Sequence, residues 1–183
     1  LGMRILLVPL GILFAAWILG YVIIRLQIGK RWPDLPPLPN LLWLSTAALI
    51  VSSGTMQWAA HCARTGATMG LRAGLSLTLL LGAAFLALQF ESWLQWMAPM
   101  MEHLSEADEY RYALAAFYVL TGLHAAHVIG GLVPMFIVTV RSMRTDANAL
   151  RNGVLPGVQY VAIYWHFLDA VWIVLFITLK LCG

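Results

Sequence analysis

Residues 112–140, YALAAFYVLTGLHAAHVIGGLVPMFIVTV, decide the fold, because this run contains no Asp, Glu, Lys or Arg. A helix that crosses the hydrocarbon of a bilayer needs about 20 consecutive apolar residues, and the run is long enough. Strands of a membrane barrel alternate apolar and polar residues, and this run does not alternate. The stretch therefore predicts a transmembrane α-helix.

Four further runs have the same character, and Asp169 is the one charged residue that they contain. They cover residues 5–24, 41–60, 73–90 and 157–179. Together the five runs predict an all-α membrane protein, folded as a five-transmembrane-helix bundle. We expect a single membrane domain over residues 1–183, with helices at about 5–26, 41–61, 71–97, 111–140 and 157–181.

The composition points the same way. Hydrophobic residues make up 61% of the 183 residues and charged residues only 10%, and the mean hydropathy is +0.82. A soluble domain of this length could not cover so much apolar surface. The net charge of +3 is small and there is no basic run, which argues against nucleic acid as a partner.

Lys and Arg residues in the connections predict the orientation. Five spans place the two termini on opposite sides of the membrane. One side then holds Arg4, Arg64, Arg72, Arg141, Arg144 and Arg151, and the other holds Arg25, Lys30, Arg31, Arg111 and Lys180. Because the side richer in Lys and Arg faces the cytoplasm, the count predicts a cytoplasmic N-terminus.

Titratable residues inside the predicted helices are the candidate functional groups, since such groups are costly in a membrane and face the bundle interior. His124 and His127 lie three residues apart and share a helical face, as do His166 and Asp169. In antiparallel neighbouring helices, His127 and Asp169 lie at nearly the same depth. This predicts a carboxylate–imidazole pair between the last two helices.

Two further titratable residues lie at helix ends, and both are expected at the membrane interface. Glu91 ends the third apolar run, and His61 ends the second on the opposite side. Three interpretations of the polar residues in the last two helices remain open: hydrogen bonds between helices, a proton or water path, and metal or haem ligation. The candidate set for a structural network, or for a proton or water network, comprises His124, His127, His166, Asp169, Glu91 and His61.

Small residues are also placed periodically in the fourth run. Gly122, Ala126 and Gly130 are each four residues apart. Such a row lets a second helix approach closely, so we expect a helix contact along it.

Two motifs in order resemble the haem–copper oxidase subunit III family, the third subunits of cytochrome c and ubiquinol oxidases. FYVLTGLHAAHVIGG (117–131) is similar to the family's Gly-x-His-x-x-His-Val-x-x-Gly helix, and YWHFLDAVWIVLF (164–176) to its Trp-His-Phe-x-Asp-x-x-Trp helix. LPNLLWLSTAALIVSSGTMQWAAH (38–61) and LTLLLGAAFLALQFESW (77–93), with its Gln-Phe-Glu ending, resemble the helices between. The resemblance covers about 35–182 and implies the short, five-helix form of subunit III.

The resemblance also implies a function. It is that of a non-catalytic subunit of a respiratory haem–copper terminal oxidase, which supports assembly and stability of the oxygen-reducing, proton-pumping complex in aerobic electron transport. The chain would be an enzyme only as part of that complex. It would bind no metal or redox cofactor itself, while the haems and copper belong to the partner, catalytic subunit I. Other implied partners are further respiratory subunits and bound phospholipid, in the bacterial plasma (inner) membrane.

The chain departs from the family pattern at two places. The family usually has a buried glutamate in the helix before the proline-rich loop, whereas residues 5–24 contain no acid. Ala60 stands where a histidine often precedes His61. A proton role that depends on that glutamate is therefore not implied here.

Two alternative functions remain open from the sequence. A b-type haem membrane anchor would use histidines on two helices at matched depth as axial ligands, and His127 and His166 come near this requirement. A subunit-III-like accessory protein of nitric oxide reductases lies within the same family.

Overall fold

The computed structural model describes residues 2–29, 32, 37–103, 108–144 and 155–182. This part of the chain forms five helices: α1 (Gly2–Ile28), α2 (Leu41–Thr65), α3 (Thr68–His103), α4 (Asp108–Arg144) and α6 (Leu155–Cys182). Each helix covers one predicted apolar run and extends beyond it at one or both ends. Helical backbone satisfies its own hydrogen bonds, so it continues past the apolar residues into polar ends.

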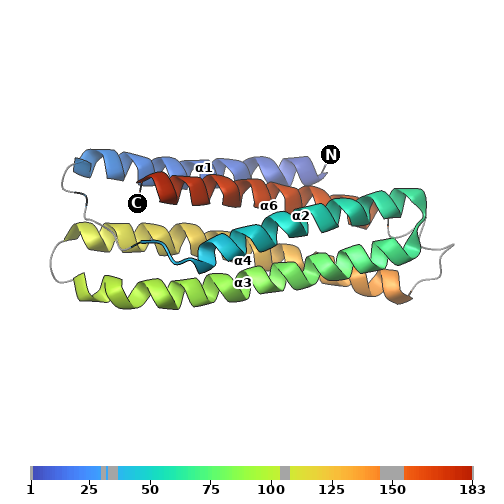
Figure 1. Ribbon diagram of the computed structural model, residues 1–183. Helices are drawn as coiled ribbons and strands as arrows, with labels where there is room; N and C mark the ends of the chain where they lie inside the picture. The colour runs from blue at the N-terminus through green and yellow to red at the C-terminus, as the bar shows by residue number, and fades with distance from the viewer. Residues whose placement is uncertain (1, 30–31, 33–36, 104–107, 145–154, 183) are drawn as a thin grey trace.

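The described helices lie side by side as an elongated bundle in which successive helices reverse direction (Figure 1). The connection between α2 and α3 is the tightest. It turns at Gly66, whose φ of +80° lies in the left-handed region that favours glycine, and Ala67 N–H donates to Cys62 O at 3.0 Å. α2 packs most extensively against α3 and also contacts α6, while α1 rests on α6 and α4.

Four described helices contain a segment long and apolar enough to cross a membrane. These segments are Leu7–Ile28, Thr68–Met97, Tyr110–Arg144 and Pro156–Leu181. α2 has a comparable length of 25 residues but is not among them, because it carries more Ser, Thr, Gln and His. The prediction of five spans is therefore supported for four helices.

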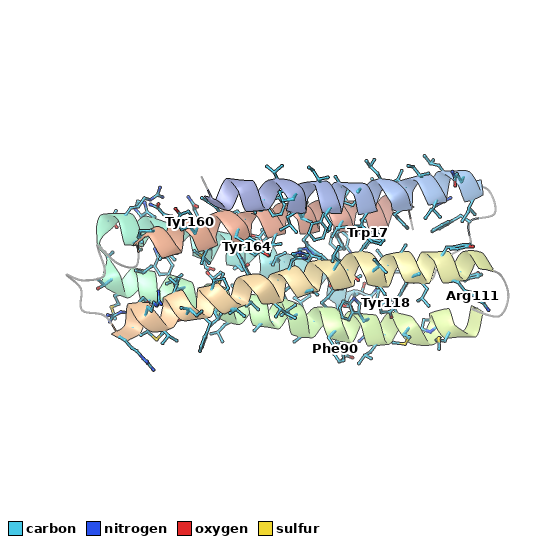
Figure 2. The ribbon with its side chains drawn as sticks, turned by 180° about the vertical axis from the view of Figure 1, so that it is seen from behind. Trp17, Phe90, Arg111, Tyr118, Tyr160 and Tyr164 are labelled. Atoms are coloured by element: carbon cyan, nitrogen blue, oxygen red, sulfur yellow. The ribbon has the colours of Figure 1, made fainter. Side chains whose placement is uncertain are left out.

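The outer surface of the bundle is apolar. Large hydrophobic side chains are exposed on all five described helices, and Phe90 of α3 projects outward in Figure 2. Trp17 is 48% exposed and Phe90 is 57% exposed. A soluble monomer rarely exposes so much contiguous apolar surface, whereas lipid or another membrane subunit would cover it.

Close approach between α4 and α6 involves only the end of the predicted small-residue row. A Cβ on Gly122 would meet nothing within 4 Å, and Ala126 is exposed, so the first two members of the row do not form the predicted helix contact. A Cβ on Gly130 would lie 3.8 Å from Tyr164 Oη, an ordinary contact, and one on Gly131 would lie 2.9 Å from the Tyr164 ring. One residue turns a helix by about 100°, so the tightest approach falls at Gly131, beside the row.

Candidate functional site

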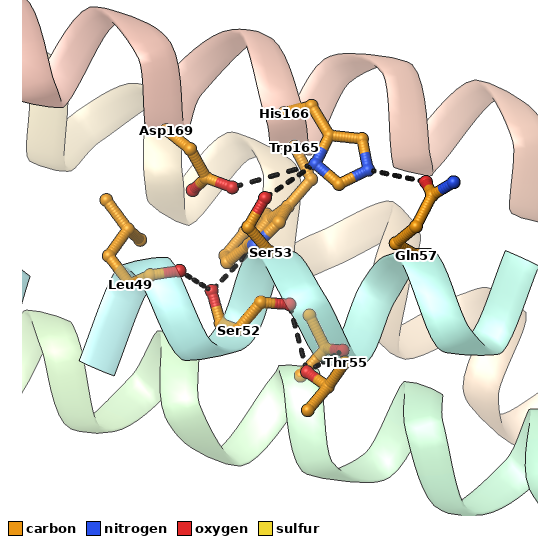
Figure 3. Close-up of polar contacts among 9 residues, drawn as sticks. Leu49, Ser52, Ser53, Thr55, Gln57, Trp165, His166 and Asp169 are labelled. Carbon is orange, nitrogen blue, oxygen red and sulfur yellow. Dashed lines mark hydrogen bonds and ion pairs between the residues drawn. The ribbon is translucent and has the colours of Figure 1, made fainter. Parts of the chain in front are cut away.

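A line of polar side chains joins α2 to α6 through the bundle, and we call it the polar seam. Figure 3 shows its middle part. Its members are Thr46, Ser52, Ser53 and Gln57 of α2 and Trp165, His166, Asp169 and Trp172 of α6.

Two tryptophans of α6 anchor the seam to hydroxyl groups of α2. Trp165 Nε1–H donates to Ser52 Oγ at 3.0 Å, and Trp172 Nε1–H donates to Thr46 Oγ1 at 3.0 Å. A buried indole N–H usually finds a partner, and no water is needed to supply it here. These bonds satisfy polar groups on the face that α2, which is not among the four candidate spans, turns toward α6.

His166 uses both of its ring nitrogens in the seam. Its Nδ1 lies 2.7 Å from Ser53 Oγ, and its Nε2 lies 3.2 Å from Gln57 Oε1. An amide oxygen only accepts, so Nε2–H donates to Gln57. In the singly protonated ring, Nδ1 then accepts from the Ser53 hydroxyl.

Asp169 lies one helical turn further along α6, near the middle of the span Pro156–Leu181. Its residue is 5% exposed, and its Oδ2 lies 3.9 Å from His166 Nδ1. Neither carboxyl oxygen has a hydrogen-bond partner within the described protein. A buried carboxylate without a donor is costly, so the imidazole beside it is its main electrostatic partner.

A groove between α2 and α6 leads to this pair. It has a volume of about 250 Å³ and is lined by Gln57, Ala60, Arg64, Gln159, Ala162, Ile163 and His166. Arg64 lies at the end of α2 that carries the Gly66 turn, and the His166 side chain at the other end of the lining is 35% exposed. The imidazole is therefore open to the groove, while the carboxyl group behind it is enclosed.

His124 lies in a very different environment, which we call the aromatic cluster. Its ring contacts Phe14 of α1, Phe85 of α3 and Trp172 of α6, with centroids 6.2, 5.8 and 5.0 Å away. The residue is 0% exposed, and neither ring nitrogen has a hydrogen-bond partner. His124 therefore holds three other helices to α4 by packing.

Gln89, like Asp169 and His124, is a buried polar side chain without a hydrogen-bond partner in the described protein. Trp93 Nε1 donates to Thr121 Oγ1 at 3.0 Å and fixes the register between α3 and α4. Because the two helices run in opposite directions, this register places Gln89 at about the level of His124.

The predicted pair between His127 and Asp169 is wrong. His127 Nδ1–H donates to Leu123 O of its own helix at 2.7 Å, and its ring lies 5.2 Å from that of Phe14 of α1. Asp169 instead faces His166 and α2. Counting residues along the two helices predicted only that His127 and Asp169 lie at the same depth. The rotation of each helix about its axis turns the two side chains toward different neighbours.

Glu91 and His61 lie apart from these groups. Both side chains are exposed, and the polar contact of Glu91 is a long one, 3.4 Å from Gln95 Nε2 to Glu91 Oε1. Of the six candidate residues, the structure thus joins His166 to Asp169 and places both His124 and His127 in contact with the Phe14 ring.

The described residues contain no group of three or more His, Cys, Asp or Glu side chains able to hold a metal ion. His127 faces α1 and His166 faces α2. The two rings therefore do not face one another across a haem-sized space, which disfavours the b-type haem anchor.

Sequence reasoning missed the α2 side of the seam. Ser53 and Gln57 are four residues apart and share a face. That spacing of polar residues within a predicted span was the available signal, because polar groups in membrane helices face the bundle interior.

Comparison with known proteins gives a consistent result. A family model described as cytochrome c oxidase subunit III matches residues 2–183. A probable cytochrome c oxidase subunit 3 of Nocardia farcinica is 33% identical over 91% of this chain and 79% of its own length. One from Mycobacterium bovis is 35% identical over 89% and 77%, and one from Rickettsia felis is 30% identical over 96% and 58%.

Proposed function

The chain belongs to the cytochrome c oxidase subunit III family, and on that premise we propose that it is a non-catalytic subunit of a haem–copper terminal oxidase. Its role there is to support assembly and stability of the oxygen-reducing, proton-pumping complex. The haems and copper belong to a partner, catalytic subunit I, and other respiratory subunits complete the complex.

One observation carries this proposal: the histidines His124, His127 and His166 are committed to contacts between or within helices. Both nitrogens of His166 are engaged by α2, and the ring of His124 is enclosed by aromatic side chains. His127 bonds its own backbone. Side chains used in this way brace a scaffold, and the exposed apolar faces offer surface to partner subunits and lipid.

The family and the four apolar helices make this chain an integral membrane protein. We extend this to a single membrane domain with α2 as a fifth span, since its hydroxyls and Gln57 turn toward other helices. The bacterial relatives point to the plasma membrane. The six-to-five division of Lys and Arg supports a cytoplasmic N-terminus.

A groove between α4 and α6 supports the proposal of bound phospholipid. Its volume is about 410 Å³, and its lining includes Pro134, Arg141, Tyr160 and Tyr164. Tyr160 and Tyr164 are labelled in Figure 2. An apolar wall beside an arginine at the helix end suits an acyl chain and its phosphate.

Purification through a tag on this chain from its native membrane tests the proposed function. We expect a large multi-span partner to co-purify and the reduced-minus-oxidised spectrum to show haem–copper oxidase bands. After the chain is stripped away, those bands should stay with the partner. Haem that remains on the stripped chain would overturn the proposal.

A second measurement tests the absence of a redox centre in this chain. Replacing His124 and His127 together by Leu should leave the haem content per assembled complex unchanged. Loss of one haem signal without loss of a subunit would contradict the non-catalytic role.

A further inference from the structure

We propose that His166 and Asp169 form a proton-binding site in the middle of the bundle, which exchanges protons with water through the groove between α2 and α6. The inference concerns this chain's own residues, so it holds whichever complex contains the chain. Its ligand is the proton, delivered by water in the groove.

The first argument is the charge of the pair. Asp169 is 5% exposed, and its oxygens form no hydrogen bond of ordinary length within the described protein, although His166 and Ser53 lie beside the carboxyl group. With neither His166 Nδ1 nor the Asp169 carboxyl group protonated, the pair would carry a net negative charge in an apolar interior. With one proton it is neutral, either as carboxylic acid with imidazole or as carboxylate with imidazolium. Because burial penalises net charge, the enclosed pair favours holding one proton.

The second argument is the surrounding hydrogen bonds, which accommodate both neutral forms. When the proton is on Asp169, Ser53 O–H donates to His166 Nδ1 across 2.7 Å. When it is on His166, Nδ1–H points toward Ser53 Oγ and Asp169 Oδ2, the latter 3.9 Å away. His166 Nε2–H donates to Gln57 in both forms. The proton can therefore change sites while the contact between α2 and His166 remains.

The third argument is access. His166 is part of the groove lining, whereas Asp169 is enclosed behind it. Gln57 and Gln159 supply polar groups along the groove, and Arg64 lies near its end. Asp169 is 13 residues beyond Pro156, or about 20 Å along the helix axis at 1.5 Å per residue. A proton that reaches His166 from the arginine end has thus crossed much of the half-membrane on that side.

Few other charged groups compete for this proton. α2 presents Ser53 and Gln57 to the pair and Arg64 further along the groove. α1, which packs on α6, has no charged residue between residues 5 and 24. On α4, His124 faces the aromatic cluster and His127 faces Phe14, so neither ring faces the carboxyl group.

Infrared difference spectroscopy between low and high pH tests the site. The sample is the full chain purified in mild detergent with the subunits it retains. We expect a pH-dependent carboxyl signal that is lost in Asp169→Asn and shifted in frequency in His166→Gln, where the carboxyl group remains. Glu91→Gln is the matched control and should keep the signal. Identical difference spectra for the wild type and Asp169→Asn would overturn the proposal.

Hydrogen–deuterium exchange of the same carboxyl signal tests the route. Ala162→Leu narrows the groove without changing charge, and we expect about tenfold slower exchange, which corresponds to about 1.4 kcal/mol of added barrier. Ala84→Leu, an exposed position on α3 outside the groove lining, should exchange like the wild type. Equal rates in all three proteins would exclude the groove as the path.

Discussion

His166 and His124 are the same residue type within neighbouring helices, yet the polar seam and the aromatic cluster treat them in opposite ways. His166 is hydrogen-bonded through both nitrogens, lies beside a carboxyl group and opens to a groove. His124 is 0% exposed, lies among three aromatic rings and has no hydrogen-bond partner. The first environment can exchange a proton, and the second can only pack.

Trp172 belongs to both regions and joins them. Its indole N–H bonds Thr46 of α2, while its ring contacts Phe85 of α3 and His124 of α4. The difference between the two histidines therefore does not reflect separate parts of the fold. The difference arises at a single side chain, because Trp172 meets a hydroxyl group of α2 through its N–H and aromatic rings of α3 and α4 through its ring.

Removing Trp172 should break both regions together and produce the largest effect. Trp172→Ala deletes a side chain that is 0% exposed, and such changes cost about 3–5 kcal/mol of unfolding free energy. Chemical unfolding of the purified protein in detergent measures the loss. Trp17→Ala, at a 48% exposed tryptophan on α1, is the control and should cost little. Similar losses of unfolding free energy in the two variants would show that Trp172 does not hold the helices together.

Gly82 offers a way to disturb the seam from the α3 side. A Cβ there would lie 2.7 Å from the Trp165 ring and 2.8 Å from Leu132 Cδ2, so Gly82→Ala should displace the indole from Ser52. Overpacking of this kind costs about 1–3 kcal/mol. Gly122→Ala, where the new Cβ meets nothing within 4 Å, should instead stabilise α4 by roughly 0.5–1 kcal/mol. Equal effects on the unfolding free energy would refute the close contact.

The smallest effects on the unfolding free energy are expected when His166 or His124 is replaced by Leu, which is of similar size. The two variants compare the polar seam with the aromatic cluster directly. His166→Leu leaves Ser53, Gln57 and Asp169 without the imidazole, at a cost of about 1–3 kcal/mol. His124→Leu loses ring contacts but also removes two unpartnered buried nitrogens, so the unfolding free energy should change by less than about 1 kcal/mol. A larger loss of unfolding free energy for His124→Leu than for His166→Leu would contradict the environments that we assign to the two histidines.

Much of the architecture was predictable because it depends on local sequence. Long apolar runs, free of charged residues except for Asp169 in the last, predicted each helix, since a spanning backbone must bond to itself. The helix ends differ from prediction because polar residues at the interface continue the helix. The family was also predictable, since two motifs with fixed spacing occur in order.

The candidate site was predictable only in part. The spacing of three residues correctly placed His166 and Asp169 on one face of α6, but depth alone paired Asp169 with the wrong histidine. Depth follows from counting residues along antiparallel helices. The partner follows from helix rotation, which depends on side chains that are distant in sequence, such as Ser53 and Phe14.

By itself, the sequence determined that this chain forms apolar helices, that few titratable groups lie within them, and which family it belongs to. Tertiary structure decided which of those groups meet. Gly131 approaches Tyr164 more closely than any member of the predicted row, and α2 rather than α4 faces the His166–Asp169 pair. The physical reason is that apolar periodicity barely distinguishes the faces of a helix that is hydrophobic all round, so packing between helices chooses the face.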